Sequence, residues 1–140
     1  MSIHYPARIT PQVDGGFLVQ FVDMEDTFTE GETLEEALFN AAEVLSAMVS
    51  WHLDEGHVLP KPTPDLLDAE LHYVTPDAKT QSALLLRQAR GDRSFADLAR
   101  ALETSWPAAK RLEDANHWPS LKQLDRAARV LGKRLVLSFE

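Results

Sequence analysis

The chain has 140 residues, 44% of them apolar, with 22 acidic and 14 basic side chains and no cysteine. The absence of cysteine excludes disulfides, thiolate metal sites and thiol nucleophiles. No apolar run approaches the roughly 20 residues that span a bilayer, and residues 1–10 lack the basic and apolar segments of a secretion signal, so we expect a soluble, cytoplasmic protein with no membrane partner.

Charge divides the chain into two halves of opposite sign. Residues 1–75 carry 14 acidic and 2 basic side chains, a net charge of −12, whereas residues 76–140 carry 8 acidic and 12 basic ones, a net charge of +4. An acidic half repels a polyanion, while a basic half gains affinity for phosphates through counterion release. We therefore predict two domains, residues 1–75 and 76–140, with different partners.

The first elements expected are the two strands of a hairpin. Apolar and polar residues alternate over residues 3–10 and again over residues 17–21, which is typical of strands with one buried face. The Asp-Gly-Gly sequence at residues 14–16 supplies the positive backbone dihedral angles of a tight turn. Pro6 cannot donate to a strand ladder, so we expect the first strand to lie at a sheet edge or to carry a bulge there. We place a short third strand over residues 27–29.

A long helix and a final strand complete the acidic half. Thr33 and Glu36 have the spacing of a capping box, and apolar residues then recur at helical spacing as far as Gly56, which predicts one long amphipathic helix. The proline-rich residues 59–64 favour an extended segment, followed by a strand over residues 70–74. We therefore expect an α+β fold, in which a small antiparallel-rich sheet carries one long helix on one face.

Several carboxylates and two histidines of this half have a second interpretation. The carboxylates could form a two-metal nuclease cluster, because hard cations bind several carboxylate oxygens, but charge runs more often mark solvated or interacting faces. The histidines lie five residues apart without the glutamate of a zinc helix, so we interpret His52 as a packed residue. The carboxylates are Asp14, Asp23, Glu25 and Asp26, and the histidines are His52 and His57.

Four motifs of the acidic half are similar to those of a known family. They are Tyr5-Pro6-Ala7, Asp14-Gly15-Gly16-Phe17, the run T-E-G-E-T-L-E-E-A at residues 29–37, and Leu59-Pro60-Lys61-Pro62. Together they resemble the HicB-like antitoxin module over residues 3–75, and the run at 29–37 is the most specific of them. The resemblance implies a degenerate ribonuclease-H-like fold that binds and blocks HicA, a small basic RNA-cleaving toxin. Residues 22–26 depart from the family's Pro-Asp-Leu-Pro-Gly-like segment.

The basic half contains four helix starts. Thr75-Pro76-Asp77 supplies a cap residue and a proline for the first turn, which predicts a helix over residues 76–90. Ser94 and Ser105 begin two short helices joined by a turn of about three residues, which is helix-turn-helix geometry. Ser120 opens a capping box for the last helix. We therefore expect an all-α second domain.

Residues 94–131 resemble the helix-turn-helix domain of phage repressors and Cro proteins. The matching positions are Leu98-Ala99, Ser105, Arg111-Leu112-Glu113 and Pro119-Ser120-Leu121. In that family the second motif helix enters the major groove of DNA and its exposed early residues contact base edges. Carried over by position, the expected base readers are Ser105, Trp106, Pro107, Lys110 and Arg111, and the residues expected near phosphates are Ser94, Asn116 and Lys122. Lys110 and Arg111 are the strongest candidates, because basic side chains donate to guanine edges.

Two positions depart from the helix-turn-helix pattern. Glu103 stands where the turn usually has glycine, so it must either take a left-handed conformation or form a different turn. Trp106 replaces a polar reader, and it can contact a base or pack on a neighbouring helix or subunit, since its side chain offers one donor and no acceptor. A helical bundle with a solvated basic surface is the alternative for the whole half.

The last eight residues form an apolar segment with strand character. Residues 133–140 have no strand partner within a helical domain, and an unpaired strand favours pairing with a copy of itself. We predict that two such segments pair across a twofold axis in a homodimer, with a homotetramer as a further assembly. Two recognition helices would then lie about 34 Å apart and require a palindromic operator.

These observations favour an antitoxin that also represses its own operon. In this hypothesis the acidic domain neutralises a HicA-like mRNA-cleaving toxin, and the basic domain binds operator double-stranded DNA. No catalysis, metal or cofactor is required. The alternative is a metal-dependent nuclease domain targeted to nucleic acid by the second domain. A third interpretation is a regulator that binds a small molecule, although no convergent polar pocket is evident in the sequence.

Overall fold

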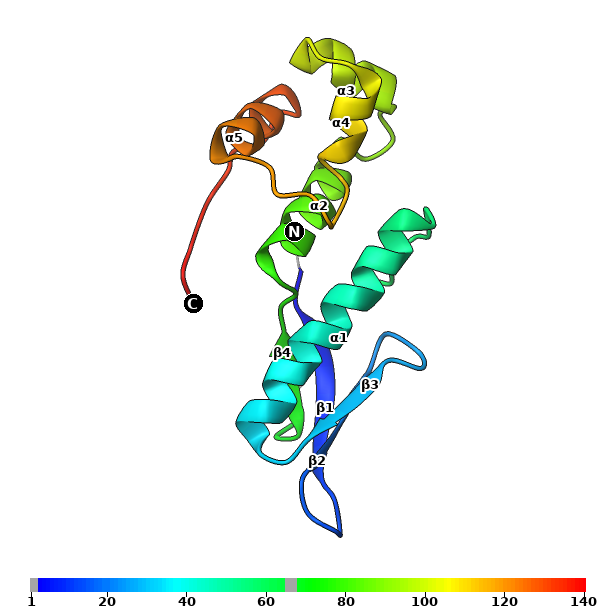
Figure 1. The fold of residues 1–140 in the computed structure, drawn as a ribbon, viewed down its shortest axis with the longest axis vertical. Helices are drawn as coiled ribbons and strands as arrows, with labels where there is room; N and C mark the ends of the chain where they lie inside the picture. The colour runs from blue at the N-terminus through cyan, green and yellow to red at the C-terminus, as the bar shows by residue number, and fades with distance from the viewer. Residues whose placement is uncertain (1–2, 65–67) are drawn as a thin grey trace. The chain divides into compact units, whose positions relative to one another are not determined.

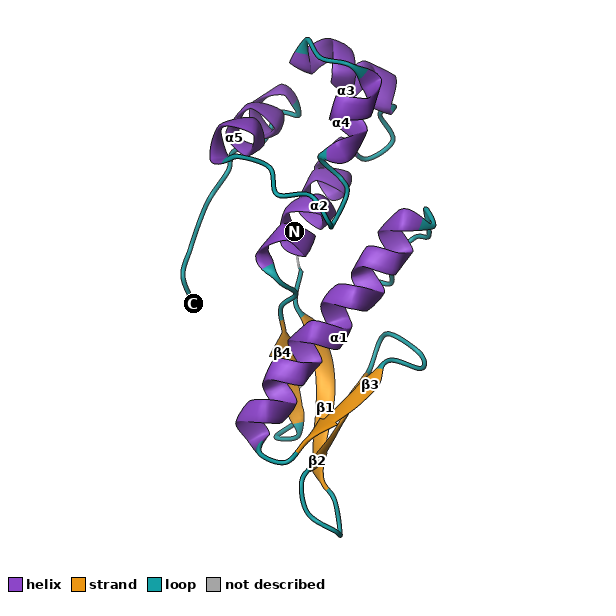
Figure 2. Ribbon diagram, viewed as in Figure 1, coloured by secondary structure: helices purple, strands orange, loops and turns teal. Residues whose placement is uncertain are grey.

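The computed structural model describes residues 3–64 and 68–140. The chain forms two compact units, the first ending at Asp77 and the second comprising residues 78–140 (Figure 1). Within the described residues, strands occur in the first unit and the second is built from helices (Figure 2). None of the described helices is both long and apolar enough to cross a membrane.

The first unit contains a four-stranded antiparallel sheet in the order β3-β2-β1-β4. Its strands are β1 (Tyr5–Pro11), β2 (Phe17–Phe21), β3 (Phe28–Gly31) and β4 (Leu71–Val74). Strands β1 and β2 form the predicted hairpin, in which Ile9 lies opposite Val19. Gly15 and Gly16 take the positive φ angles of its turn, +97° and +80°. The third strand is present but begins one residue later than predicted and is longer, and β4 confirms the predicted final strand.

The prediction that Pro6 marks a sheet edge is wrong. β1 is an inner strand, bonded to β2 on one side and to β4 on the other. In an antiparallel ladder the N–H and C=O of one residue point toward the same neighbouring strand. The Pro6 carbonyl accepts from the Val22 amide at 3.0 Å, and β2 ends at the residue before Val22. The donor that proline lacks therefore falls where the β1–β2 ladder has already ended.

Helix α1 (Leu34–Asp54) covers one face of this sheet (Figure 1). The Thr33 hydroxyl accepts from the Glu36 amide at 3.1 Å, which is one half of the predicted capping box. The start of the helix approaches β3 closely because Gly31 has no side chain: a Cβ there would lie 2.4 Å from the Ala37 nitrogen. The buried residues of α1 are Ala37, Ala41, Leu45, Ser46 and Val49.

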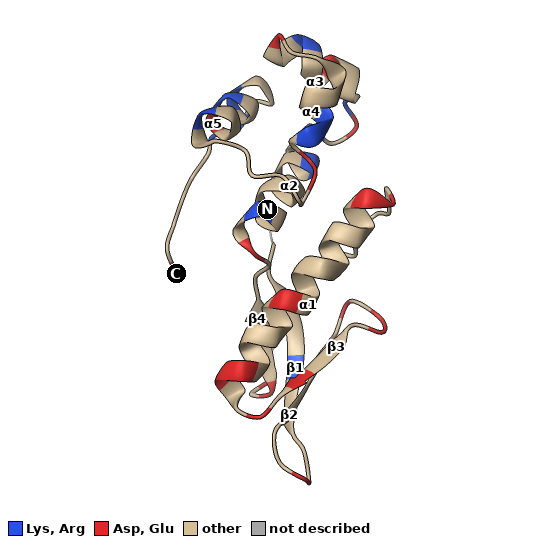
Figure 3. Cartoon of the chain, viewed as in Figure 1, with Lys and Arg blue, Asp and Glu red and all other residues tan. Residues whose placement is uncertain are grey.

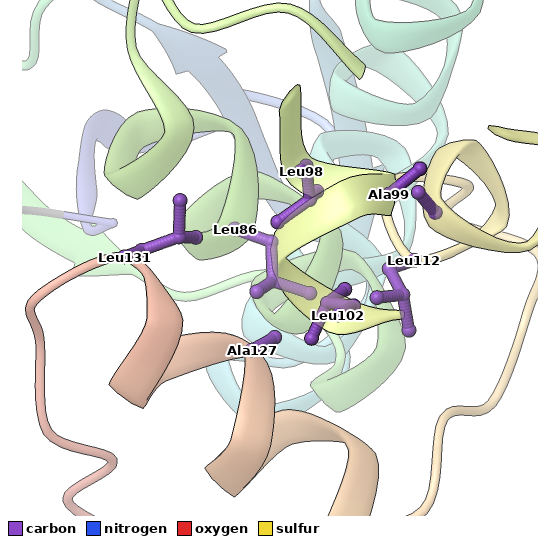
Figure 4. Packing of buried hydrophobic residues seen from close by; sticks show 8 residues of the cluster. Leu86, Leu98, Ala99, Leu102, Leu112, Ala127 and Leu131 are labelled. Atoms are coloured by element: carbon purple, nitrogen blue, oxygen red, sulfur yellow. The ribbon is translucent and has the colours of Figure 1, made fainter. Parts of the chain in front are cut away.

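Four helices surround a leucine and alanine core in the second unit. They are α2 (Ala78–Arg90), α3 (Phe95–Leu102), α4 (Trp106–Arg111) and α5 (Leu121–Val130). Leu86 of α2, Leu98 and Leu102 of α3, and Ala127 of α5 meet in this core (Figure 4). The predicted Ser120 capping box is present in both directions. Burial of these apolar side chains is the main force that holds the short helices together.

The first helix of the basic half begins later than predicted. Helix α2 starts at Ala78, two residues after the expected start. The Thr75 hydroxyl lies 2.5 Å from Nδ1 of His4, and the Asp77 amide donates to the Ser46 hydroxyl at 2.8 Å. The residues expected to cap and open α2 are therefore bonded to the sheet unit instead.

The predicted C-terminal strand is absent from the single chain. Residues 133–140 run on from α5 without helix or strand (Figure 1). Val136 and Leu137 are exposed, to 72% and 65%, and Leu135 is partly buried. A strand requires a neighbour for its N–H and C=O groups, and residues 78–140 contain no other strand to provide one.

Candidate functional site

Helices α3 and α4 are joined by a short, sharply defined turn. The Ser94 hydroxyl accepts from the Asp97 amide at 3.1 Å, and the Ser105 hydroxyl accepts from the Ala108 amide at 3.2 Å, so each serine caps its own helix. Between them Glu103 ends α3 in the left-handed conformation, with φ 54° and ψ 46°. Of the two turn geometries that the sequence left open at Glu103, the structure therefore has the left-handed one.

The structure places five of the eight predicted DNA-contacting residues at one helix. Ser105 caps α4, and the exposed side chains of Trp106, Pro107, Lys110 and Arg111 belong to it. The other three lie apart from α4 in sequence: Ser94 caps α3, Asn116 is in the α4–α5 connection, and Lys122 is in the first turn of α5. All eight are exposed, so each is available to a ligand.

Trp106 packs on a neighbouring helix, which is one of the two roles that its sequence position left open. Its ring contacts the Phe95 ring edge-on, with 5.9 Å between the centroids, so one side of the indole packs within the unit. The side chain is nevertheless about half exposed. The Lys110 ammonium lies 5.2 Å from the indole centroid, within the range of a cation–π contact. Trp106 therefore supports Lys110 on the exposed surface of α4.

A buried ion pair lies behind this surface and was not predicted from the sequence. Nε of Arg90 donates to one carboxylate oxygen of Glu113 at 2.5 Å, and Nη2 donates to the other at 3.1 Å. The guanidinium carbon also lies 4.1 Å from the centroid of the Phe95 ring. Arg90, Phe95 and Trp106 thus form a continuous set of contacts between α2, α3 and α4. The two charges are 23 residues apart, and no sequence pattern links them.

The first unit leaves most of its negative charge exposed. Its basic residue Arg8 binds Asp68 at 2.9 Å. The backbone amide of Glu70, followed by the Arg8 guanidinium, holds the pKa of Asp68 below its usual value. Helix α1 carries four acidic side chains and no lysine or arginine, as the red bands along it in Figure 3 show. This surface suits a cationic partner.

The carboxylates considered for a metal cluster do not come together as one. Both carboxylate oxygens of Asp23 accept bonds from Thr63, at 2.8 Å from its amide and 2.5 Å from its hydroxyl. Asp23 thereby ties the β2–β3 connection to the extended segment. No group of three or more potential ligands that could hold a metal ion occurs among the described residues.

The two histidines form part of an aromatic cluster at the end of α1. The ring centroids of His52 and His57 are 5.4 Å apart, and each ring lies edge-on to Trp51, at 5.0 and 4.9 Å. His52 is partly buried, in agreement with its interpretation as a packed residue. Trp51 and His57 are exposed, so this is a surface cluster of edge-on rings with His52 partly covered.

The sequence comparisons identify relatives over nearly the whole chain. A family model described as the HicB-like antitoxin of bacterial toxin-antitoxin systems matches residues 4–75. Antitoxin HicB of Escherichia coli K12 is 29% identical over 137 residues, which cover 96% of this chain and 98% of the relative. Antitoxin HicB of Pseudomonas fluorescens Pf0-1 is 30% identical over 129 residues, covering 90% and 87%.

A further relative extends the match to almost every residue of this chain. Antitoxin HicB 1 of Photorhabdus laumondii is 27% identical over 141 aligned positions, which cover 99% of this chain and 88% of the relative. The family model coincides with the acidic sheet-and-helix unit, and the long alignments include the helical unit as well. The chain belongs to the HicB-like antitoxin family of bacterial toxin-antitoxin systems.

Proposed function

We propose that this chain is a cytoplasmic antitoxin that neutralises a HicA-like RNA-cleaving toxin with its first unit and represses its own operon with its second. The observation that carries the proposal is the separation of charge between two units of different architecture. A surface of net charge −12 attracts a basic RNA-binding protein, and the +4 unit attracts DNA. The degenerate ribonuclease-H-like assignment of residues 3–75 belongs to the same proposal, supported by the antiparallel sheet with a helix on one face.

Neutralisation follows from charge and shape alone. An RNA-cleaving toxin must expose basic groups to hold its substrate. An acidic surface that covers those groups excludes RNA by competition, and it requires no catalytic group of its own. The family membership implies a toxin partner, and the carboxylates exposed on α1 provide complementary charge.

DNA binding rests on the exposed face of α4. Lys110 and Arg111 place two cationic donors on a short helix whose start is held by the Ser105 cap and by the contact between Trp106 and Phe95. In this proposal α4 enters the major groove, Arg111 and Lys110 read guanine edges, and Ser94, Asn116 and Lys122 contact phosphates. The left-handed turn at Glu103 supports it by setting α4 at an angle to α3.

The operator-binding form is a homodimer built by residues 133–140. The exposed side chains of Val136, Leu137 and Phe139, on backbone outside any helix or strand, suit antiparallel pairing with the same segment of a second chain. Pairing across a twofold axis places two α4 helices at half-sites about 34 Å apart. Further association of dimers into tetramers is part of the same proposal.

The toxin half of the proposal is tested by an RNA-cleavage assay with the full chain. The probe is the small basic protein encoded by the adjacent reading frame, with a single-stranded RNA as substrate. Addition of an equimolar amount of this chain should abolish cleavage. Undiminished cleavage at a saturating concentration of the chain would contradict the antitoxin role.

The DNA half is tested with the promoter duplex of the same operon. The double variant Lys110→Ala/Arg111→Ala should weaken binding by about 10- to 100-fold and lower the slope of log K against log salt, because both base and phosphate contacts are lost. The matched control, Lys79→Ala/Arg129→Ala, removes two positive charges from α2 and α5, outside both the predicted DNA-contacting residues and residues 133–140, and should leave sequence discrimination intact. Equal effects of the two double variants would contradict α4 as the reading helix.

A further inference from the structure

A phenylalanine stands exposed in the middle of an acidic helix face. Phe39 is 67% exposed, although the buried residues of α1 on either side of it, Ala37 and Ala41, are 0% exposed. On a helix, the side chains three and four residues away are the nearest neighbours. For Phe39 these are Ala42 and three glutamates, Glu35, Glu36 and Glu43.

The three glutamates have no cationic partner within the described residues. The ion pairs of Arg8 with Asp68 and Glu70 involve none of these three glutamates. Glu35, Glu36 and Glu43 are all exposed. An aromatic side chain ringed by unpaired carboxylates combines an apolar anchor with charge, the composition of a binding hot spot rather than of an ordinary solvated face.

We propose that the α1 face centred on Phe39, with Glu35, Glu36 and Glu43 around it, is the surface on which the cationic toxin docks. This inference rests on the proposed antitoxin function and names the surface that performs it. Phe39 enters an apolar depression of the toxin or lies under an arginine, and the glutamates pair with the lysines or arginines around that site. RNA then loses access to the same basic groups.

Charge decides between a toxin and a second copy as the occupant of this face. Two first units would each bring a net charge of −12 to the contact, and like charges placed together oppose association. A basic protein gains from every one of these carboxylates. Figure 3 shows red bands and no blue along α1, so the helix carries acidic residues and no lysine or arginine.

Phe28 provides a matched control within the same unit. It is also exposed, to 61%, but it lies on β3 opposite Gln20. Its neighbour along β3, Thr29, pairs with the buried Val19, so Thr29 faces α1 and Phe28 faces away from it. A substitution there removes the same aromatic area from the opposite face of the sheet.

The test is the affinity of the full chain for the basic protein encoded by the adjacent reading frame, measured by titration calorimetry. Phe39→Ala should raise Kd by at least about 30-fold, as for an aromatic hot spot. Phe28→Ala should change Kd by less than about 3-fold. Because Phe39 is exposed and alanine is the better helix former, the helical signal in circular dichroism should be unchanged by Phe39→Ala.

The charge contribution is tested through association kinetics. Glu36→Gln/Glu43→Gln should slow association by about 5- to 50-fold at low salt and flatten its dependence on ionic strength, because steering is lost. Asp14→Asn/Glu25→Gln removes two exposed charges from loops of the same unit and should have a much smaller effect. Equal slowing by the two pairs would show that only net charge matters and would overturn this surface.

The possible outcomes distinguish failure of the proposed Phe39 surface from failure of the proposed antitoxin function. Tight toxin binding that Phe39→Ala leaves unchanged overturns the surface and leaves the antitoxin function standing. Absence of toxin binding by the unsubstituted chain overturns both. If Phe39→Ala instead lowers the molecular mass of the chain in sedimentation without toxin, the occupant is a second copy and the proposal is wrong.

Discussion

The two units use their charged residues in opposite ways. In the second unit, basic residues pair with acidic ones: Arg90 with Glu113, Arg100 with Asp97, Arg126 with Glu103, and Arg129 with Asp125. In the described part of the first unit, Arg8 forms ion pairs with Asp68 and Glu70. Part of the charge of the second unit is therefore neutralised within the fold, whereas most carboxylates of the first unit lie on its surface.

This difference extends to where the charges lie. Arg90 and Glu113 have side chains 16% and 6% exposed, so one pair of the second unit is part of its interior. The interior of the first unit is formed by large apolar side chains of the sheet and α1, such as Tyr5, Val19 and Leu45. A buried ion pair thus stabilises the second unit, whereas the charges of the first unit lie mainly on its surface. Substitution of the buried pair should therefore change stability more than substitution of exposed charges.

The largest effect should come from breaking the buried pair. Glu113→Ala leaves the Arg90 guanidinium inside the second unit without its carboxylate, which should lower the free energy of unfolding of that unit by about 3–5 kcal/mol. The control is Asp125→Ala at an exposed pair, where a loss of about 0–1 kcal/mol is expected. Amide hydrogen exchange, which resolves the two units separately, is the measurement. Equal losses would show that burial of the pair is irrelevant.

The next largest effect tests the packing of the first unit. Gly31→Ala places a Cβ 2.4 Å from a backbone nitrogen of α1, so the helix must shift from β3, at a cost of about 1–3 kcal/mol. Amide hydrogen exchange should be faster in α1 and β3 of the variant than of the parent, and unchanged in residues 78–140. Gly56→Ala, where φ is +69° and no atom lies within 4 Å, isolates the cost of backbone strain and should stay near about 1 kcal/mol. A larger loss of stability from Gly56→Ala than from Gly31→Ala would contradict the close approach of α1 to β3 at Gly31.

An alkaline sensitivity should be confined to the first unit. Burial, followed by the nearby Asp23 carboxylate, raises the pKa of Tyr5 above its ordinary value of 10.0. Its contribution to stability is complete below pH 10, where the hydroxyl is protonated in both states. It is lost as the pH rises through the elevated pKa of the folded state, because the unfolded chain releases the proton first.

Tyr5→Phe checks this titration. The substitution removes the bond from the Tyr5 hydroxyl to the Pro60 carbonyl and should cost about 1 kcal/mol at neutral pH. Above pH 10, the variant should lose stability less steeply than the parent. Parallel decline of the two proteins above pH 10 would assign the sensitivity to another group.

The smallest effect compares two left-handed residues, one in each unit. Glu103 and Asp26 both have positive φ angles, 54° and 55°. Aspartate tolerates this conformation better than glutamate, because its short side chain can bond locally. Glu103→Gly should therefore stabilise the second unit by about 0.5–1 kcal/mol. Asp26→Gly should stabilise the first unit by a smaller amount. Thermal unfolding followed by hydrogen exchange would contradict the comparison if Asp26→Gly proved the more stabilising.

The sequence predicted most elements because their signals are local. Thr33, Ser94, Ser105 and Ser120 each cap a helix through a bond that spans three residues, so residue type and spacing are sufficient. The alternation around the turn at residues 14–16 identified the hairpin for the same reason. The residues expected to be exposed on α4 came from the resemblance to helix-turn-helix domains, and they are exposed in the structure.

The tertiary structure decided whatever depends on residues far apart in the chain. Pro6 lies in an inner strand because β4, more than 60 residues later, pairs on its other side. Thr75 bonds to His4 rather than capping α2, and Arg90 finds Glu113 through the packing of separate helices. The packing of the hydrophobic core determines which of these residues meet. Because the partners are far apart in the chain, the spacing of residues in the sequence does not predict such contacts. Composition and periodicity determined the elements and the sign of each surface, and packing determined which charges were buried and which remained exposed.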